Sequence, residues 1–448
     1  MTQVEQTVLD QEVRELLDKQ AVHPISTSDA AGFISSLFVV PKKDGGNHPV
    51  LNLRPLNQFL VYEHFKMEGI HMFRDLLRQG DYLVKIDLKD AYLTVPIWKG
   101  HQKYLRFLWK ETLLEFACLP FGLATAPRVF TKLMKPVVAM LRQRGVRLII
   151  YLDDVLIMAE STSLALHHAA SALNVLEGLG FDVNYHKSQL IPSQQIEFLG
   201  FLVDSVTLSL QLPGEKLRKI RKRCQQLLNV GETSIRELSK FLDLLTSSVQ
   251  AVFPAPLHYR HLQRLKNLNL NTLQSYNAII PLDSRARIVW WRDHLQAWNG
   301  KALFHKSVDL VIETDASRKG WGAYCEGVST GGPWCSNEQR LHINSLELLA
   351  GSFAIKTFCK DRAVAHAKLL MDNVSAVAYI NKMGGTHSQS LANLAIDLWH
   401  WCLDHKIHVS VEHLPGDLNF RADRESRVIT DSSDWKLNPA FFKILVQK

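Results

Sequence analysis

The stretch RLIIYLDDVLIMA, residues 147–159, gives the first prediction about the fold. Two apolar runs, 147–152 and 155–159, flank the pair Asp153-Asp154. Apolar runs on either side of two turn-forming residues are typical of a β-hairpin. Asp is common in turns because of its backbone geometry, so this stretch alone leaves a purely structural turn open.

A second acid lies at the end of another apolar strand. YLVKIDL, residues 82–88, places Asp87 at this position. Carboxylates on neighbouring strand ends repel one another, and divalent cations offset that repulsion. Two such ions about 3.5–4 Å apart hold both the attacking and the leaving oxygen of a phosphoryl transfer. Asp87 and Asp153 therefore predict a two-metal site.

The composition is that of a globular protein with several domains. The chain has 448 residues, of which 46% are hydrophobic and 21% charged, which excludes a largely disordered or collagen-like chain. It has no run of 18 apolar residues and no apolar leader, so no membrane association is expected. Six scattered cysteines predict reduced thiols of an intracellular protein. The net charge of +8 favours a polyanionic partner.

Periodicity predicts a helix over 1–20, two strands within 33–56, and a helix over 162–179 that ends at Gly180. Residues 216–223 carry six Lys or Arg on a segment of helical character. A solvated helix face and a phosphate-binding face both fit this charge run. From residue 308 onwards, strands and then alternating helices predict a compact mixed α/β domain.

This C-terminal part carries a second set of acids, at the ends of predicted strands and near the start of a helix. They are Asp315, Glu347, Asp372 and Asp423. A single Asp at a strand end is often only a helix cap. Four acids that converge from such positions predict a second metal site.

Several ordered motifs resemble those of one family. They are VPKKDGGNHPVLNLRPLN (40–57), IDLKDAY (86–92), LPFGLATAPRVFTKLM (119–134), YLDD (151–154) and EFLGF (197–201). The set resembles the reverse transcriptases of retrotransposons and retroviruses, and its flanking phrases are most similar to DIRS and gypsy-like elements. TDAS, SLELLA, MDNVSAV and HLPGDLNFRAD resemble the ribonuclease H of the same elements.

The resemblance implies an α+β multidomain fold, with a right-hand polymerase, a small connection and a mixed α/β ribonuclease H domain. The expected boundaries are an N-terminal helical extension at 1–22, fingers and palm at 23–204, a thumb at 205–253, a connection at 254–305, ribonuclease H at 306–430 and a C-terminal tail at 431–448. The basic segment 216–223 would then lie in the thumb, where family members grip the duplex backbone.

For the polymerase, the resemblance implies Asp87 and Asp153 as metal ligands, with the Leu88 carbonyl as a backbone ligand and Asp154 as the supporting carboxylate. Tyr92 matches the aromatic steric gate that excludes ribonucleotides. A buried strand aromatic is the alternative for this residue.

Further matches concern substrate binding. Lys42 and Lys43 resemble residues that hold the incoming triphosphate, and His48 stands where many relatives have an arginine, a stronger phosphate partner. Phe121 and Gly122 match the segment against the templating base pair. Phe198, Leu199 and Gly200 resemble the primer grip, with a buried strand and a glycine bulge as the alternative.

For the ribonuclease H part, the resemblance implies that Asp315, Glu347, Asp372 and Asp423 bind two Mg²⁺ ions, as the polymerase site does, with Mn²⁺ as a substitute. His413 matches a histidine that assists product release, and a histidine satisfied at a strand end is the alternative. Asn419 and Ser345 match positions near the hybrid backbone. The segment GGTH leaves no room for an extra basic helix, so hybrid binding would depend on the polymerase half.

The implied function is that of an RNA-directed DNA polymerase, a nucleotidyltransferase, with ribonuclease H endonuclease activity in retrotransposon replication. Its partners would be an RNA template, a DNA primer, RNA–DNA hybrids, dNTPs and other element-encoded proteins, in the cytoplasm, the nucleus or both. Two alternatives remain. One is a domesticated or decayed protein that only binds nucleic acid, and the other is a nuclease with an inactive polymerase half.

Overall fold

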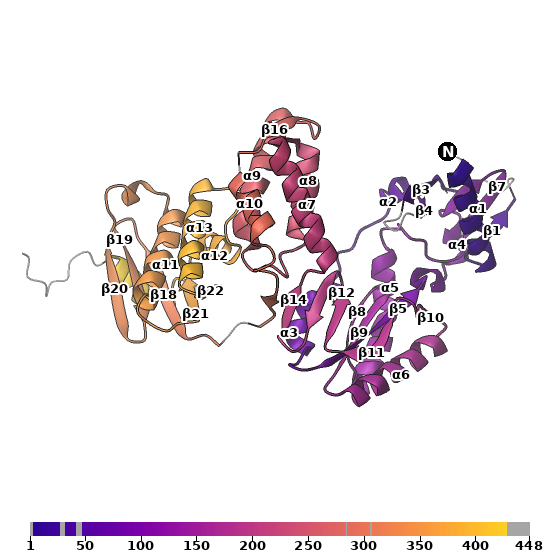
Figure 1. The fold of residues 1–448 in the computed structure, drawn as a ribbon, viewed down its shortest axis with the longest axis horizontal. Helices are drawn as coiled ribbons and strands as arrows, with labels where there is room; N and C mark the ends of the chain where they lie inside the picture. The colour runs from indigo at the N-terminus through magenta and orange to yellow at the C-terminus, as the bar shows by residue number, and fades with distance from the viewer. Residues whose placement is uncertain (1–2, 27–31, 42–46, 284, 305–306, 428–448) are drawn as a thin grey trace, which may run out of the picture. The chain divides into compact units, whose positions relative to one another are not determined.

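The computed structural model describes residues 3–26, 32–41, 47–283, 285–304 and 307–427 (Figure 1). The chain divides into two compact units, Met1–Ser209 and Leu210–Lys448. The division falls close to residue 204, the expected end of the fingers and palm. The finer boundaries inside each unit stay predictions. The described part contains no helix that is both long and apolar enough to cross a lipid bilayer.

The first unit begins with helix α1 (Gln3–Asp18), which buries Leu9 and Val13 as the helical periodicity predicts. A four-stranded sheet follows. In spatial order its strands are β1 (Val22–Ile25), β7 (Thr112–Phe116), β6 (Arg106–Trp109) and β2 (Ile34–Ser35). The two strands predicted around the Gly-Gly turn form a separate hairpin of β3 (Leu37–Pro41) and β4 (Asn47–Leu51).

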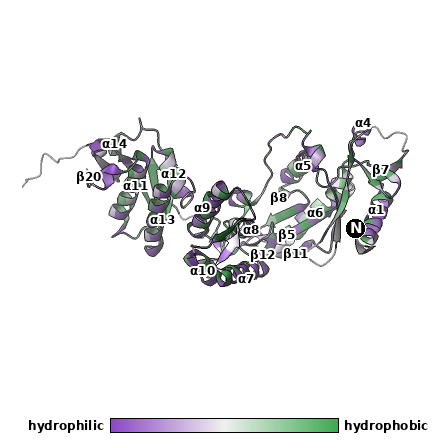
Figure 2. Cartoon of the chain, turned by 90° about the horizontal axis from the view of Figure 1, so that it is seen from above, coloured by the Kyte–Doolittle hydropathy of each residue, from purple (hydrophilic) through white to green (hydrophobic). Residues whose placement is uncertain are grey.

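A five-stranded sheet in the same unit carries the first group of acids. Its central path is β10 (Asp182–Val183), β5 (Tyr82–Lys89), β9 (Asp154–Ala159) and β8 (Arg147–Tyr151), and β11 (Gln189–Ser193) also pairs with β5. β5 and β9 are rich in apolar residues, and Figure 2 shows this for β5. The side chains of Val84, Ile86 and Ile157 are fully buried.

Helices α5 (Ala126–Gln143) and α6 (Thr162–Gly178) pack against this sheet. The α6 N-terminus is capped by Ser161, whose Oγ accepts a hydrogen bond from the Leu164 amide. Just after its C-terminus, Gly180 adopts φ +85°, a left-handed conformation that glycine tolerates. The predicted helix and its stop signal are confirmed.

The second unit starts with a helical part. Its helices are α7 (Gly214–Val230), α8 (Ile235–Thr246), α9 (Ala255–Leu273) and α10 (Arg285–Asp293). Strands β15 (Glu232–Ser234) and β16 (Ile279–Pro281) form a two-stranded sheet. Strand β14 (Ser209–Gln211) is hydrogen-bonded to β17 (Lys301–Ala302). α9 packs against α8, and α10 packs against α7. The expected border between thumb and connection at 253/254 therefore runs through a single group of packed helices.

One histidine in this helical part is buried in a way that couples stability to pH. His258 on α9 is 5% exposed and stacks on Trp290, with 3.7 Å between the ring centroids. Burial, with Arg287, His400 and His294 nearby, lowers the pKa of His258 to about 3. The ring therefore stays neutral in the folded chain at a pH where an unfolded chain binds a proton.

The free energy of unfolding is expected to fall as the pH drops from 6.5 toward 3, because only the unfolded state gains the proton. At pH 5 the loss from this residue is about 2 kcal/mol. Denaturant unfolding of the chain at pH 7 and pH 5 measures it. His258→Gln should reduce the pH dependence, whereas the exposed His186→Gln should leave it intact. An unchanged slope in His258→Gln would contradict the assignment.

The second unit ends in a mixed sheet with the spatial order β20 (Val328–Pro333), β19 (Gly320–Cys325), β18 (Leu310–Ala316), β21 (His366–Met371) and β22 (His408–His413). The first three strands are antiparallel and the last two continue parallel to β18. The helices are α11 (Ile343–Cys359), α12 (Val374–Asn381), α13 (Gln389–Asp404) and α14 (Phe420–Arg427). Figure 1 shows α11 and α13 beside the sheet.

Helix α14 packs on the sheet face opposite α11, over strands rich in glycine. A Cβ atom on Gly322 would lie 2.4 Å from both the Ala422 carbonyl oxygen and the Ser426 nitrogen. The neighbouring Ala323 points to the other face and is buried together with Leu348 of α11. Only glycine at position 322 allows the backbone of α14 to approach β19 this closely.

Candidate active sites

Strand pairing brings the first group of acids together. β5 and β9 are antiparallel with Asp87 opposite Asp154, and the Leu88 amide donates a 2.9 Å hydrogen bond to the Asp153 carbonyl oxygen. The backbone of Asp87 is also fixed, because its amide donates to Ser188 Oγ at 3.0 Å. The three carboxylates therefore share one end of the sheet, as the sequence predicts.

The turn that presents Asp153 is strained. β8 and β9 are joined through Leu152, which has φ 55°, in the left-handed region that non-glycine residues seldom adopt. A two-residue hairpin turn with positive φ at its first central position normally favours glycine there. A costly conformation held by two paired strands is a feature of functional turns.

The charges in this group are only partly balanced. Burial raises the pKa of Asp87, and the negative charge of Asp154 adds to the effect, whereas Lys187 opposes it. Burial also raises the pKa of Asp153, with further contributions from Asp154 and Asp87. Lys85 Nζ lies 2.9 Å from Asp154 Oδ1 and balances that carboxylate. Asp87 and Asp153 are therefore the two carboxylates left for a cation.

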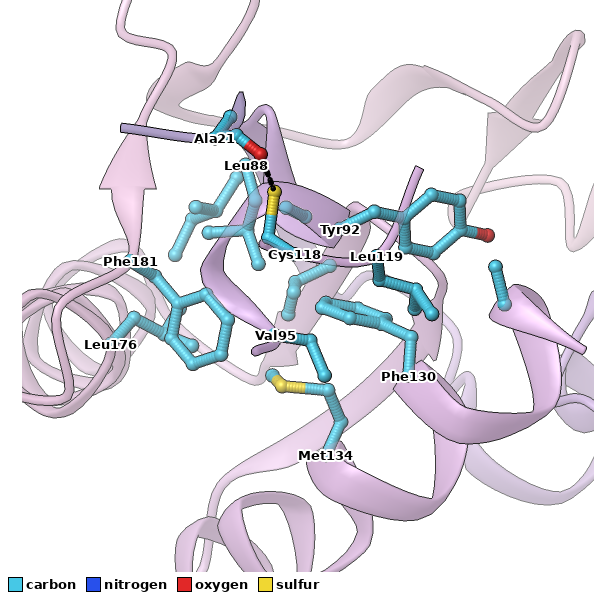
Figure 3. Packing of buried hydrophobic residues seen from close by; sticks show 14 of the residues in the cluster. Ala21, Leu88, Tyr92, Val95, Cys118, Leu119, Phe130, Met134, Leu176 and Phe181 are labelled. Atoms are coloured by element: carbon cyan, nitrogen blue, oxygen red, sulfur yellow. Dashed lines mark hydrogen bonds between the residues drawn. The ribbon is translucent and has the colours of Figure 1, made fainter. Parts of the chain in front are cut away.

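Tyr92 lies beside these acids at the margin of the hydrophobic core. Its ring is 9% exposed and contacts the rings of Phe121 and Phe130, with centroid distances of 5.1 and 5.5 Å. Figure 3 shows its hydroxyl directed away from the packed side chains. Burial, with the nearby charge of Asp153, raises the pKa of Tyr92 to about 12. Tyr92 is thus both a core aromatic and a neighbour of the acids.

The segment around Phe121 and Gly122 is held by an asparagine that the sequence did not single out. Asn57 Nδ2 donates to the Gly122 carbonyl oxygen at 2.9 Å, and the Ala124 amide donates to Asn57 Oδ1 at 2.9 Å. Phe121 is 48% exposed, so its ring is available to a ligand. Its other face contacts Tyr92.

The expected primer-grip residues form a tight turn. β12 (Gln195–Phe198) and β13 (Phe201–Asp204) are antiparallel, and the residues between them, Leu199 and Gly200, have φ 51° and 74°. The alternative of a strand with a glycine bulge is wrong, because positive φ at both central residues makes a hairpin turn. Phe198 is completely buried and cannot contact a nucleic acid, which corrects its assignment as a substrate-binding residue.

The basic segment 216–223 lies on α7, which buries Leu217, Ile220 and Cys224 on its inner face. A groove of about 530 Å³ lies between α7 and α8. The basic side chains that line it are Lys219, Lys222, Arg223 and Lys240. Glu237 pairs with both Arg223 and Lys240, so one carboxylate opposes four basic groups in the groove. This excess of positive charge favours a phosphate-binding face over a helix face that is only solvated.

The second group of acids is tighter. Asp315 on β18, Glu347 on α11 and Asp372 after β21 each offer an oxygen, and these oxygens lie within 4.8 Å of one another. It is the one such group among the residues that the structure describes. β18 and β21 are parallel, so both strands deliver their acids to the same edge.

Burial makes this group electrostatically unfavourable on its own. Glu347 is 4% exposed, and burial together with Asp315 and Asp372 raises its pKa to about 9. Its Oε2 is buried and has no hydrogen-bond partner among the described residues. Three clustered carboxylates, of which one buried oxygen has no hydrogen-bond partner, are the chemistry of a Mg²⁺ or Mn²⁺ site. The donor set therefore fits a divalent cation.

The other residues expected at this centre have different surroundings. Asp423 on α14 lies outside the 4.8 Å group and accepts a 2.9 Å hydrogen bond from Arg427 Nε. His413 is exposed and pairs with Met371, directly before Asp372.

Asn419 and Ser345 were expected near the backbone of a bound hybrid, and both are buried. Asn419 is fully buried and donates from Nδ2 to the carbonyl oxygen of Thr314, directly before Asp315, at 2.9 Å. Ser345 is 2% exposed and hydrogen-bonds with Ser390.

Comparison with known proteins agrees with this geometry. Residues 40–203 match the family described as "Reverse transcriptase (RNA-dependent DNA polymerase)". The matched segment contains the first group of acids, with Tyr92 and the hairpin of Asp153.

The curated proteins that the chain is similar to include viral and transposon polyproteins. The chain is 24% identical over 435 residues to the enzymatic polyprotein of Cauliflower mosaic virus (strain Strasbourg), which covers 93% of this chain and 60% of the polyprotein. The match to the transposon Tf2-3 polyprotein of Schizosaccharomyces pombe is 27% over 165 residues, 37% of this chain and 12% of that polyprotein. The chain therefore spans about 60% of the length of the viral relatives.

Solved structures show the same fold. The foamy viral protease-reverse transcriptase in complex with dsDNA has a TM-score of 0.59 at 20% identity, covering 92% of this chain and 83% of that one. Its complex with an RNA/DNA hybrid has a TM-score of 0.58 at 19% identity, and the match covers 97% of this chain and 56% of that one. The predicted fold class, a multidomain α+β chain, is confirmed.

Lys42 and Lys43 lie outside the described residues, and so does the side chain of His48. Lys85 and Ser188 were missed because nothing in their local sequence marks them. Their roles depend on which strands become neighbours.

Proposed function

We propose that the chain copies RNA and then DNA into DNA and hydrolyses the RNA strand of the resulting hybrid, in the replication of a retrotransposon. The pairing of Asp87 with the Asp153–Asp154 turn, inside the segment that matches the reverse transcriptase family, is the observation that carries this proposal. The order of motifs favours a DIRS or gypsy-like element, working in the cytoplasm, the nucleus or both. Other element-encoded proteins would be among its partners.

In the polymerase centre, Asp87, Asp153 and the Leu88 carbonyl would hold two Mg²⁺ ions, with Asp154 in support. Bound ions would lower the pKa of the primer 3′ hydroxyl and neutralise charge on the phosphates. Lys85 holds Asp154 at 2.9 Å, which leaves Asp87 and Asp153 to face the substrate. Leu199 and Gly200 would contact the primer, and Lys42 and Lys43 the triphosphate of the dNTP.

In the ribonuclease H centre, Asp315, Glu347 and Asp372 would hold the ions and Asp423 would complete the set. The buried, partnerless Oε2 of Glu347 supports this role. His413, exposed beside the strand that ends at Asp372, would assist release of the cleaved RNA. Basic side chains of α7 would hold the phosphates of the duplex.

A primer-extension assay on an RNA template, with the RNA labelled to follow its cleavage, tests the proposal on the purified chain. We expect both DNA synthesis and RNA cleavage with Mg²⁺ or Mn²⁺, and neither in EDTA. Binding of the template without either reaction would favour a decayed protein that only binds nucleic acid. RNA cleavage alone would favour a nuclease with an inactive polymerase half.

Tyr92→Ala is expected to admit ribonucleotides, because the ring that would crowd a ribose 2′ hydroxyl is removed. Loss of such a steric contact is worth about 10–200-fold in selectivity. The ratio of kcat/KM for dNTP and rNTP incorporation measures it. Tyr92→Phe keeps the ring contacts with Phe121 and Phe130 and should retain selectivity. Wild-type selectivity in Tyr92→Ala would remove the gate role.

A further inference from the structure

Helix α14 and the end of strand β18 are joined by two hydroxyl hydrogen bonds that run in opposite directions. Ser426 Oγ donates to Asp315 Oδ2 at 2.7 Å, and Ser317 Oγ donates to the Ser426 carbonyl oxygen at 2.6 Å. Ser426 is 1% exposed and Asp315 is 6% exposed, so water competes little for either bond.

The Ser426 hydroxyl has a second acceptor within reach. Its Oγ also lies 2.9 Å from the Asp423 carbonyl oxygen, on the same helix. A hydroxyl carries one proton, and a carboxylate is a stronger acceptor than a backbone carbonyl group. The proton therefore goes to Asp315 Oδ2 whenever that carboxylate is ionised.

The backbone of α14 fixes where this hydroxyl sits. The close approach at Gly322 places the Ser426 amide against β19, so the helix has little freedom to slide along the sheet. The geometry of the Ser426–Asp315 bond is therefore set by the sheet that also carries Asp315 and, through β21, Asp372.

We propose that Ser426 is a positioning residue of the second centre, whose hydroxyl fixes the plane of the Asp315 carboxylate and so raises the affinity of the Asp315–Glu347–Asp372 group for a divalent cation. This inference rests on the proposed ribonuclease H function. Asp372 and Asp423 repel Asp315, so without a donor on Oδ2 the carboxylate would turn away from them. Mutation of a residue that hydrogen-bonds to a metal ligand typically lowers the metal affinity by about 10–100-fold.

Mn²⁺ binding to the full chain, measured by calorimetry, tests the proposal. A background of Asp87→Asn with Asp153→Asn restricts the signal to the second centre. Ser426→Ala should weaken Mn²⁺ affinity by about 10-fold or more. Ser410→Ala is the matched control, since it removes a hydroxyl that lies 2.8 Å from His366 Nε2, at the start of β21 and away from the acids.

The same variants separate positioning from general destabilisation. In Ser426→Ala the Mg²⁺ concentration that gives half-maximal hybrid cleavage should rise about 10-fold, while the rate at saturating Mg²⁺ stays near that of the parent. Ser426→Cys replaces the hydroxyl with a somewhat larger thiol that is a weaker donor, and should shift the midpoint in the same direction. Unchanged Mn²⁺ affinity in both variants would overturn the proposal.

The behaviour of the parent chain separates failure of the proposed ribonuclease H function from failure of the positioning role of Ser426. If the parent chain neither binds Mn²⁺ nor cleaves a hybrid, the proposed ribonuclease H function fails and this inference fails with it. If the parent does both and Ser426→Ala matches it, only the positioning role is overturned.

Discussion

Asp153→Asn is expected to reduce primer extension by about 10³-fold, the scale on which removal of one electrostatic group from a reaction centre lowers kcat. Asn fits the turn as readily as Asp, so the hairpin of β8 and β9 should persist. What is lost is one of the two carboxylates that Lys85 leaves unbalanced. Single-nucleotide incorporation on an RNA template measures the loss.

Hybrid cleavage by Asp153→Asn should remain at the level of the unmodified chain, because the second group of acids lies in the other compact unit. Asp75→Asn, an exposed acid of the first unit, should extend primers normally. Wild-type extension by Asp153→Asn would mean that this carboxylate holds no essential ion.

Glu347→Gln is expected to affect the other activity: hybrid cleavage should fall by about 10³-fold, and primer extension should be retained. The exposed Asp397→Asn on α13 is the matched control. Persistent RNA cleavage in Glu347→Gln would contradict the assignment of the second centre.

The same substitution should stabilise the chain when metal is absent. The raised pKa, about 9, means that Glu347 takes up a proton on folding at pH 7.5, at a cost of about 4 kcal/mol. Gln carries no such cost, so the Tm in EDTA should rise by about 2 °C or more. Stabilisation by added Mg²⁺ should be lost at the same time. A lower Tm in EDTA would contradict this cost.

Strand and helix identity followed well from the sequence where apolar periodicity is strong. β5, β8, β9 and α6 appear where the runs of apolar residues and Gly180 predict them. Placement of Asp87 opposite Asp154 agrees with the expectation that acids at strand ends converge. Local pattern sufficed here because Asp87 lies near the end of one strongly apolar strand and Asp154 begins another.

Predictions failed where a residue's role depends on distant packing. Phe198 matched a family position expected to bind substrate, but its side chain is fully buried and packs inside the protein. β20 was missed because VSTGGP has the composition of a loop. Its glycines are instead part of the face on which α14 packs, since a Cβ on Gly331 would lie 3.2 Å from the Glu425 carbonyl oxygen.

The hydroxyl of Ser426 was not foreseen either. It reaches Asp315 across 111 residues of sequence, and a serine next to the last residue of a helix carries no mark of such a contact. The pairing depends on the close approach of α14 to β19, which no local periodicity encodes.

The central claim is that carboxylates distant in sequence form two separate centres that bind divalent cations. Crystals of the chain soaked in Mn²⁺, with anomalous diffraction recorded near the manganese edge, test it most directly. We predict one set of peaks within ligand distance of Asp87 and Asp153, and another within ligand distance of Asp315, Glu347 and Asp372. A map with both centres free of anomalous density at saturating Mn²⁺ would contradict the claim.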